Sequence, residues 1–86
     1  MIQLTTVVSS NIKAIGFDPA SSSLFVEFKP PAKPDPETGL PRKGKVIVYR
    51  GITKDLAQRF LNAPSVGTFY HAEIRGKYLG EEVELD

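Results

Sequence analysis

The sequence predicts an α+β fold, in which a three-stranded antiparallel meander is followed by two helices packed on one face of the sheet. Three observations support this prediction. Apolar and polar residues alternate over 12–17 and 24–28, β-branched residues dominate 46–49, and from residue 52 the apolar positions recur at helical spacing. The 86 residues, 41% hydrophobic and 24% charged, are typical of a single globular domain without a second core.

Each predicted strand has a local signal of its own. The first strand ends at Asp18-Pro19, which together with the three serines that follow is typical of a turn. In the second strand, Leu24, Val26 and Phe28 share one side, which indicates an antiparallel sheet with one covered face. The third strand, VIVY, combines β-branched and aromatic residues.

A long segment, KPPAKPDPETGLPRKGK at 29–45, separates the second and third strands. It holds five of the seven prolines, and each proline removes a backbone donor and fixes φ, so no strand pairing can run through it. We predict an overlong hairpin loop that is extended, mobile and independent of the core. Loops of this length without regular structure are usually either functional or disordered.

The first helix is predicted over about residues 53–63. Ile52, Leu56 and Phe60 recur at helical spacing, Thr53 can serve as the N-cap, and Pro64 prevents the helix from continuing. Burial of this apolar stripe against the sheet is expected to supply much of the core.

The second helix is predicted over 66–76, with Ser65 as its N-cap. Its apolar residues fall at successive i+4 positions: Val66, Tyr70, Ile74 and Tyr78. The predicted core joins this stripe to the first helix and the strands. It includes Ile15 or its strand neighbours, together with Val26, Leu56, Phe60, Tyr70 and Ile74.

Composition excludes several classes of protein. There is no cysteine for a disulfide or a thiolate metal site, which fits a reducing cytoplasm, and no apolar run approaches the roughly 20 residues that span a bilayer. The first ten residues lack the features of a signal peptide. We therefore expect a soluble cytoplasmic protein without membrane contact and without a cofactor.

The charge is unevenly distributed along the chain. The last six residues, EEVELD at 81–86, carry four acids, so residues 1–80 hold eleven Lys and Arg against six Asp and Glu, a balance of +5. The acidic end is predicted to be a solvated tail. The positive body is either an ordinary surface or one that prefers a polyanion, with the tail limiting indiscriminate binding.

Three short motifs occur in order along the chain: Ser9-Ser10 before an Ile-x-x-Ile-Gly-aromatic-Asp strand, Ala63-x-Ser65-x-Gly67-x-Phe69-Tyr70, and Ile74-Arg75-x-x-Tyr78. Together they resemble the KTSC domain family over roughly residues 7–80. That domain occurs at the C-terminus of some lysyl-tRNA synthetases and as small stand-alone proteins of bacteria and phages, which implies contact with RNA. Two departures stand out. The Tyr-x-Tyr common in the family reads Ile47-x-Tyr49, and its tight second hairpin is replaced by the proline-rich loop.

His71 is the only histidine and the first candidate for chemistry. A metal site needs three or four ligands, and a catalytic base needs an activated nucleophile and an orienting acid; the sequence offers neither set in a recognisable pattern. His71 lies between Thr68 and Arg75 at helical spacing, so we predict an exposed stripe of these three side chains rather than an active site. No enzymatic activity is expected.

Arg75 and the aromatic residues each allow two interpretations. Arg75 either binds phosphate through its guanidinium fork or pairs with Asp18 and holds the second helix on the sheet. Phe69, Tyr70 and Tyr78 either stack on bases or fill the core, and their spacing favours the core. Phe17 and Phe25 are the alternative stacking residues if one face of the sheet stays open.

The long loop and its borders concentrate positive charge, with Lys29, Lys33, Arg42, Lys43 and Lys45 set against only two acids. This charge is either merely solvated or contacts a polyanion, whereas the proline-rich stretch could dock on a protein partner as a polyproline II helix. We predict a non-enzymatic binding module that contacts nucleic acid, RNA before DNA. The predicted contacts are Lys33, Arg42, Lys43, Lys45 and Arg75. The alternative is a protein–protein interaction adaptor or phage accessory protein that uses the proline-rich loop or a sheet edge.

Overall fold

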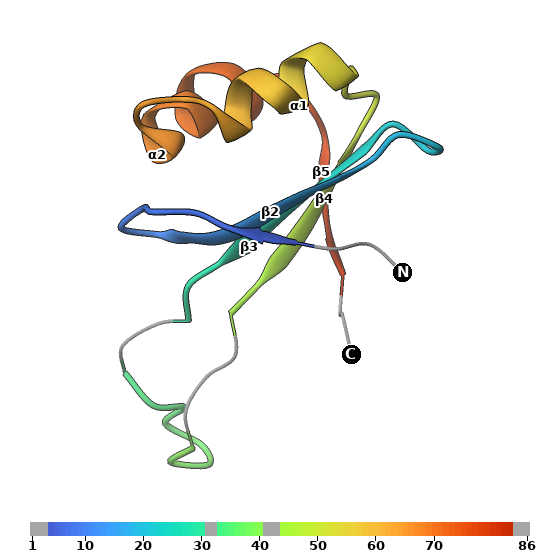
Figure 1. Ribbon diagram of the computed structural model, residues 1–86. Coiled ribbons are helices and arrows are strands. Elements are labelled where there is room, and N and C mark those ends of the chain that lie inside the picture. Colours follow the sequence, from blue (N-terminus) through green and yellow to red (C-terminus); the bar gives the residue numbers. More distant parts are fainter. Residues whose placement is uncertain (1–3, 31–32, 41–43, 84–86) are drawn as a thin grey trace.

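The computed structural model describes residues 4–30, 33–40 and 44–83. They form an α+β domain with one antiparallel sheet in the order β1-β2-β3-β4-β5 and helices on one of its faces (Figure 1). The strands are β1 (Thr5–Thr6), β2 (Ile12–Asp18), β3 (Ser23–Phe28), β4 (Val46–Arg50) and β5 (Gly80–Val83). The fold class and the three central strands were predicted correctly, but the sheet has five strands rather than three.

The β2–β3 hairpin closes at the predicted turn. The carboxylate of Asp18 accepts hydrogen bonds from the Ala20 backbone N–H and from the Ser21 hydroxyl, both at 3.0 Å. The register shifts between Ile12 and Ala14, and this irregularity in β2 accompanies the burial of both Ile12 and Ile15 in the same core. The turn therefore forms as the sequence predicts, whereas the irregularity interrupts the alternation expected over 12–17.

The acidic end of the chain forms an edge strand as far as it is described. Gly80–Val83 pairs with β4, and the carboxylates of Glu81 and Glu82 lie 3.7 Å from Arg50 Nη2 and 4.0 Å from Lys45 Nζ. The prediction of a solvated tail at 81–86 is therefore wrong for 81–83, while 84–86 lie outside the described residues. Charged side chains are common on an exposed edge strand because they discourage pairing with other chains. Here they replace the apolar alternation by which a strand is predicted from sequence.

Helix α1 (Lys54–Leu61) begins where its cap predicts. Thr53 Oγ1 accepts a hydrogen bond from the Leu56 backbone N–H at 3.1 Å, and Asp55 pairs with Arg59 one turn later at 3.2 Å. The helix ends two residues earlier than expected, with Asn62 as its C-cap.

The second predicted helix is divided into two parts. Helix α2 (Val66–Phe69), capped by Ser65, continues into a π-helical turn, η1 (Tyr70–Ile74). The chain then leaves helical geometry at Arg75, and Gly76 takes φ +82°, a left-handed conformation that glycine adopts without strain. The helical region therefore ends at 74 rather than 76, and Tyr78 follows it instead of continuing its apolar stripe.

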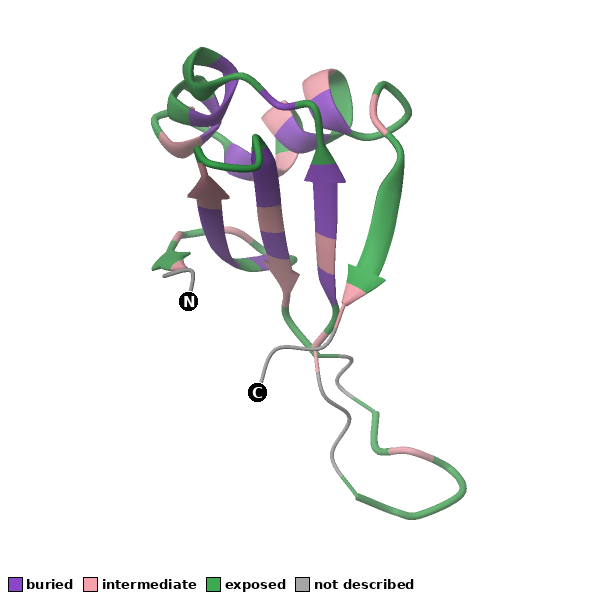
Figure 2. Cartoon of the chain, turned by 90° about the vertical axis from the view of Figure 1, so that its right-hand side faces the viewer, coloured by how far each residue is buried: buried purple, intermediate pink, exposed green. Residues whose placement is uncertain are grey.

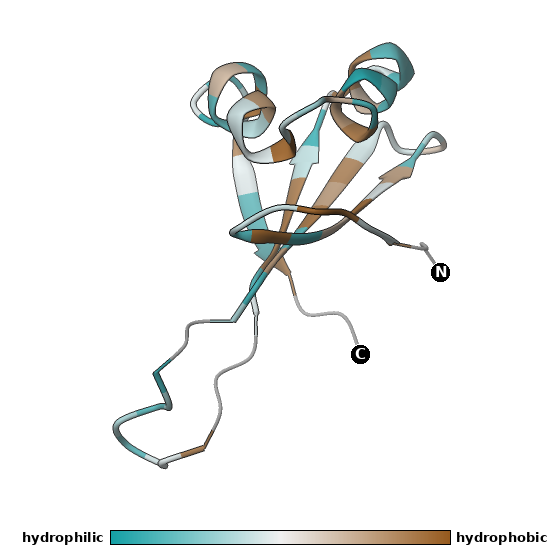
Figure 3. Cartoon of the chain, turned by 60° about the vertical axis from the view of Figure 1, so that its left-hand side comes forward, coloured by the Kyte–Doolittle hydropathy of each residue, from teal (hydrophilic) through white to brown (hydrophobic). Residues whose placement is uncertain are grey.

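The core lies between the sheet and the helices. Phe60 is fully buried, and its ring stacks on that of Phe69 at 5.4 Å between centroids. The buried cluster contains all six predicted core residues, together with Ile12, Leu24, Tyr49, Ile52, Ala57 and Val66. Figure 2 shows burial concentrated in β2 to β4 and in the sheet-facing sides of the helices, while β5 is mostly exposed. Figure 3 shows the same surfaces to be the most apolar.

Residues 33–40 of the proline-rich segment lie away from the sheet (Figure 1). Within it, residues 35–40 close a turn in which the backbone N–H of Asp35 donates to Leu40 O and that of Gly39 donates to Asp35 O. Its base is an extension of the β3–β4 pairing, because the Phe28 N–H donates to Lys45 O at 2.7 Å. None of the helices in the described part of the chain is long and apolar enough to cross a membrane.

Candidate functional site

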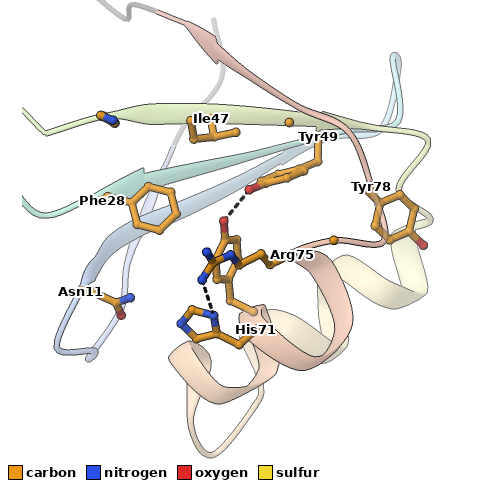
Figure 4. Close-up of a pocket in the computed structure, with 11 residues that line it drawn as sticks. Asn11, Phe28, Ile47, Tyr49, His71, Arg75 and Tyr78 are labelled. Atoms are coloured by element: carbon orange, nitrogen blue, oxygen red, sulfur yellow. Dashed lines mark hydrogen bonds between the residues drawn. The ribbon is translucent and has the colours of Figure 1, made fainter.

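An open groove of about 530 Å³ lies where η1 faces the ends of β3, β4 and β5 (Figure 4). The helical side supplies polar and aromatic side chains, and the strands supply apolar side chains and a lysine. Its lining residues are Asn11, Phe28, Lys45, Ile47, Tyr49, Tyr70, His71, Arg75, Gly76, Tyr78 and Gly80.

Two tyrosines form the floor of the groove. The hydroxyl oxygens of Tyr49 and Tyr70 are 2.5 Å apart, within a single short hydrogen bond, and the two residues are only 5% and 7% exposed. The Phe28 ring meets the Tyr70 ring edge to face at 5.4 Å. The hydroxyl pair thus lies at the end of an aromatic wall and is fixed from both sides of the domain.

Gly80 makes room for this floor. A Cβ atom at this position would lie 2.8 Å from both Ile47 Cγ2 and Tyr49 Cε1, closer than side chains tolerate. Because Gly80 pairs directly with Tyr49 across the β4–β5 ladder, the glycine lets the tyrosine ring lie against the neighbouring strand.

The ionisation of Tyr49 is strongly suppressed. Burial and the hydrogen bond with Tyr70 both raise the pKa of the Tyr49 hydroxyl well above its ordinary value, and the nearby positive charge of Arg75 offsets this only in part. Tyr49 therefore stays a neutral phenol that can donate a proton in a hydrogen bond at any physiological pH.

The π-turn positions the cation beside this floor. In η1 the Arg75 backbone N–H donates to Tyr70 O at 2.8 Å, five residues back, which widens the last turn. Arg75 Nη1 then lies 3.4 Å from His71 Nδ1. Because arginine has no acceptor, any hydrogen bond in this contact is donated by the guanidinium to Nδ1. Turns of this kind are frequent at functional sites.

Lys45 lies on the strand side of the groove, opposite this cation. Its side chain is 72% exposed and is held loosely by Glu82 at 4.0 Å. Asn11 contributes amide N–H groups, since its Oδ1 accepts from the Ser9 hydroxyl at 3.0 Å. Among the described lining residues none carries a carboxylate, so the side chains of the groove offer mainly hydrogen-bond donors. Such a surface is suited to a ligand rich in acceptor oxygens.

The groove brings together two of the five predicted nucleic-acid contacts, Lys45 and Arg75. Lys33 is exposed on the projecting segment instead, and Arg42 and Lys43 lie outside the described residues. The predicted Arg75–Asp18 ion pair is wrong, because Asp18 is engaged in its own turn while Arg75 contacts His71.

The exposed stripe of Thr68, His71 and Arg75 was predicted correctly. In the described part of the chain, no group of three or more His, Cys, Asp or Glu side chains is placed to hold a metal ion. Sequence reasoning missed the roles of Asn11, Phe28 and Tyr49. The alternation that puts Phe28 and Tyr49 on the helix-facing side of the sheet was visible, but not their proximity to Tyr70.

Three residues of the motifs noted in the sequence line the groove: Tyr70, Arg75 and Tyr78. The position that departs from the family pattern, Ile47, lines it as well. Two of the three motifs therefore contribute to the groove, through η1 and the residues that follow it.

Comparison with known proteins gives a consistent result. The family model of the KTSC domain matches residues 8–78. The crystal structure of a KTSC domain protein from Yersinia pestis is 30% identical to this chain, with a TM-score of 0.76, and the match covers 98% of this chain and 100% of that one. A search of curated proteins found no match. On the family match and this structural similarity, the chain belongs to the KTSC domain family.

Proposed function

We propose that the groove binds single-stranded nucleic acid, RNA before DNA, and that the domain acts by binding rather than by catalysis. The observation that carries this proposal is the convergence of Arg75 and Lys45, two exposed cations from different elements, on one aromatic groove. Cations that follow a backbone combined with aromatic side chains are the usual means of binding single strands.

Each part of the groove has a role in this proposal. The guanidinium of Arg75 offers a planar fork that matches phosphate, while Lys45 acts as a point charge on a flexible stem. The exposed edges of Phe28 and Tyr78 offer apolar surface to a base or ribose. The preference for RNA rests on the association of KTSC domains with synthetases noted above. A cytoplasmic site of action fits the same proposal.

The test is fluorescence anisotropy in low salt with labelled single-stranded RNA, single-stranded DNA, tRNA and duplex DNA. Arg75→Gln should weaken RNA binding about tenfold or more, because hydrogen bonds to a charged group are among the stronger ones. The matched control is Lys54→Gln, which removes one exposed positive charge from α1, outside the groove. Equal losses in both variants would indicate only a general charge effect, and no binding at tens of micromolar protein would refute the proposal.

A protein–protein adaptor remains the second candidate, favoured by the projection of the proline-rich segment from the body of the domain (Figure 1). A segment docked in an aromatic groove of a partner binds largely through apolar and backbone contacts. Such binding would change little with salt, whereas nucleic-acid binding would weaken steeply.

A further inference from the structure

The tyrosine pair at the floor of the groove has one hydroxyl proton more than it uses. Two phenols carry two O–H groups, and the contact between Tyr49 and Tyr70 consumes only one of them as a donor. Among the described residues, the two hydroxyls have no other hydrogen-bond partner. The second proton is therefore available to a group outside the protein.

The surroundings of this proton specify what can accept it. Both tyrosines line the groove together with Arg75, whose positive charge is close enough to the Tyr49 hydroxyl to lower its pKa. The acceptor must then sit next to a positive charge, within a groove whose described side chains offer mainly donors. An anionic oxygen satisfies both conditions, while an ammonium or another donor satisfies neither.

We propose that the tyrosine pair is a ligand-binding element, in which one hydroxyl donates its free proton to a phosphate oxygen held by Arg75. This inference rests on the proposed function. It adds to the same groove an uncharged hydrogen-bond donor for the phosphate, which the sequence did not indicate. The tyrosine that accepts the hydrogen bond within the pair keeps its own hydroxyl proton free to donate to the ligand. The pair therefore acts as a single hydrogen-bond donor. The raised pKa of the Tyr49 hydroxyl is consistent with this role, because the phenol keeps its proton beside an anion.

The pair also adds selectivity that charge alone does not supply. A phosphate bound only by Arg75 and Lys45 could sit anywhere within reach of two flexible side chains. Two buried phenols, held by the aromatic wall and by the β4–β5 pairing, fix one donor in place. The phosphate is then placed against the aromatic floor, where an adjoining base or ribose can pack.

The experiment compares the double variant Tyr49→Phe/Tyr70→Phe with the control Gln58→Ala, using a labelled single-stranded RNA oligonucleotide and fluorescence anisotropy. Gln58 is an exposed residue of α1 and does not line the groove. The double variant should bind about tenfold or more weakly, and the control should stay within about twofold of the parent protein. If the double variant binds RNA as well as the parent does, this inference fails while the proposed function stands. If the parent protein binds no RNA, both fail.

A second measurement does not depend on the variants folding. The chain has only three tyrosines, so labelling tyrosine with ¹³C at Cζ gives three resonances, which report on their hydroxyl groups. Addition of unlabelled RNA should shift the Tyr49 and Tyr70 signals more than that of Tyr78. Bound RNA that leaves both signals unchanged would overturn the inference.

Discussion

The hydrogen bond between Tyr49 and Tyr70 makes a prediction about stability that needs no ligand. Each phenylalanine substitution removes one hydroxyl and leaves the other without its protein partner at the floor of the groove. Because water in the groove can reach the remaining hydroxyl, each substitution should cost the net value of one hydrogen bond, about 0.5–1.5 kcal/mol. The double variant removes both polar groups and keeps both rings, so it should cost less than about 1 kcal/mol. The two substitutions should therefore be strongly non-additive.

These effects are large enough to measure. A typical stability of 0.05–0.15 kcal/mol per residue corresponds to about 4–13 kcal/mol for a chain of 86 residues. Urea unfolding followed by circular dichroism resolves differences of this size, with Tyr78→Phe as the control that should change the free energy of unfolding by less than about 0.5 kcal/mol. A double variant that loses the full sum of the two single losses would show that the hydroxyls do not satisfy each other.

Three further predictions concern the core, the alkaline limit and the loop. Truncating Phe60 to Ala should lower the free energy of unfolding by about 3–5 kcal/mol because the ring is fully buried. Gln58→Ala, at an exposed position of the same helix, should be near neutral. An unchanged urea midpoint for the Phe60 variant would mean that the buried face of the helix has been assigned wrongly. Because the folded-state pKa of Tyr49 lies above its unfolded value of about 10, the folded chain keeps a proton that the unfolded chain has lost. The contribution of the Tyr49 hydroxyl to the free energy of unfolding is therefore complete below about pH 10. Above that pH it falls by about 1.4 kcal/mol per pH unit, and urea titrations of Tyr49→Phe should not show this slope. Replacing residues 30–43 by Asn-Gly should keep cooperative unfolding and an equal or higher melting temperature, since a tight turn matches the twist of the strands; a variant that fails to fold would show that the segment is structural.

Much of the fold could be predicted because its signals are local. A cap such as Thr53 or a turn such as Asp18-Pro19 acts within four residues, and the alternation of Leu24 and Val26 in β3 follows from burial of one face. The two edge strands gave no such signal. β1 is two residues long, too short for any alternation, and β5 has acids where an apolar pattern would have revealed it.

The π-turn and the groove could not be predicted for a different reason. The i+4 spacing of Val66, Tyr70 and Ile74 fits an α-helix as well as the observed widened turn, because the extra residue enters only after Tyr70. The groove joins residues that are 21 apart in the case of Tyr49 and Tyr70, and their meeting depends on how the helices pack on the sheet. Positive charge could be counted in the sequence, but only packing shows that Lys45 and Arg75 share one groove while Lys33 does not.

The dependence of RNA binding on salt tests the central claim most directly. Two cations that each neutralise one phosphate of a single strand imply a slope near −1.4 for log affinity against log salt, at about −0.7 per phosphate. Arg75→Gln and Lys45→Gln should each reduce the slope to about −0.7, and Lys54→Gln should leave it unchanged. If neither groove variant alters the slope measured for the parent protein, the groove is not where the phosphates bind.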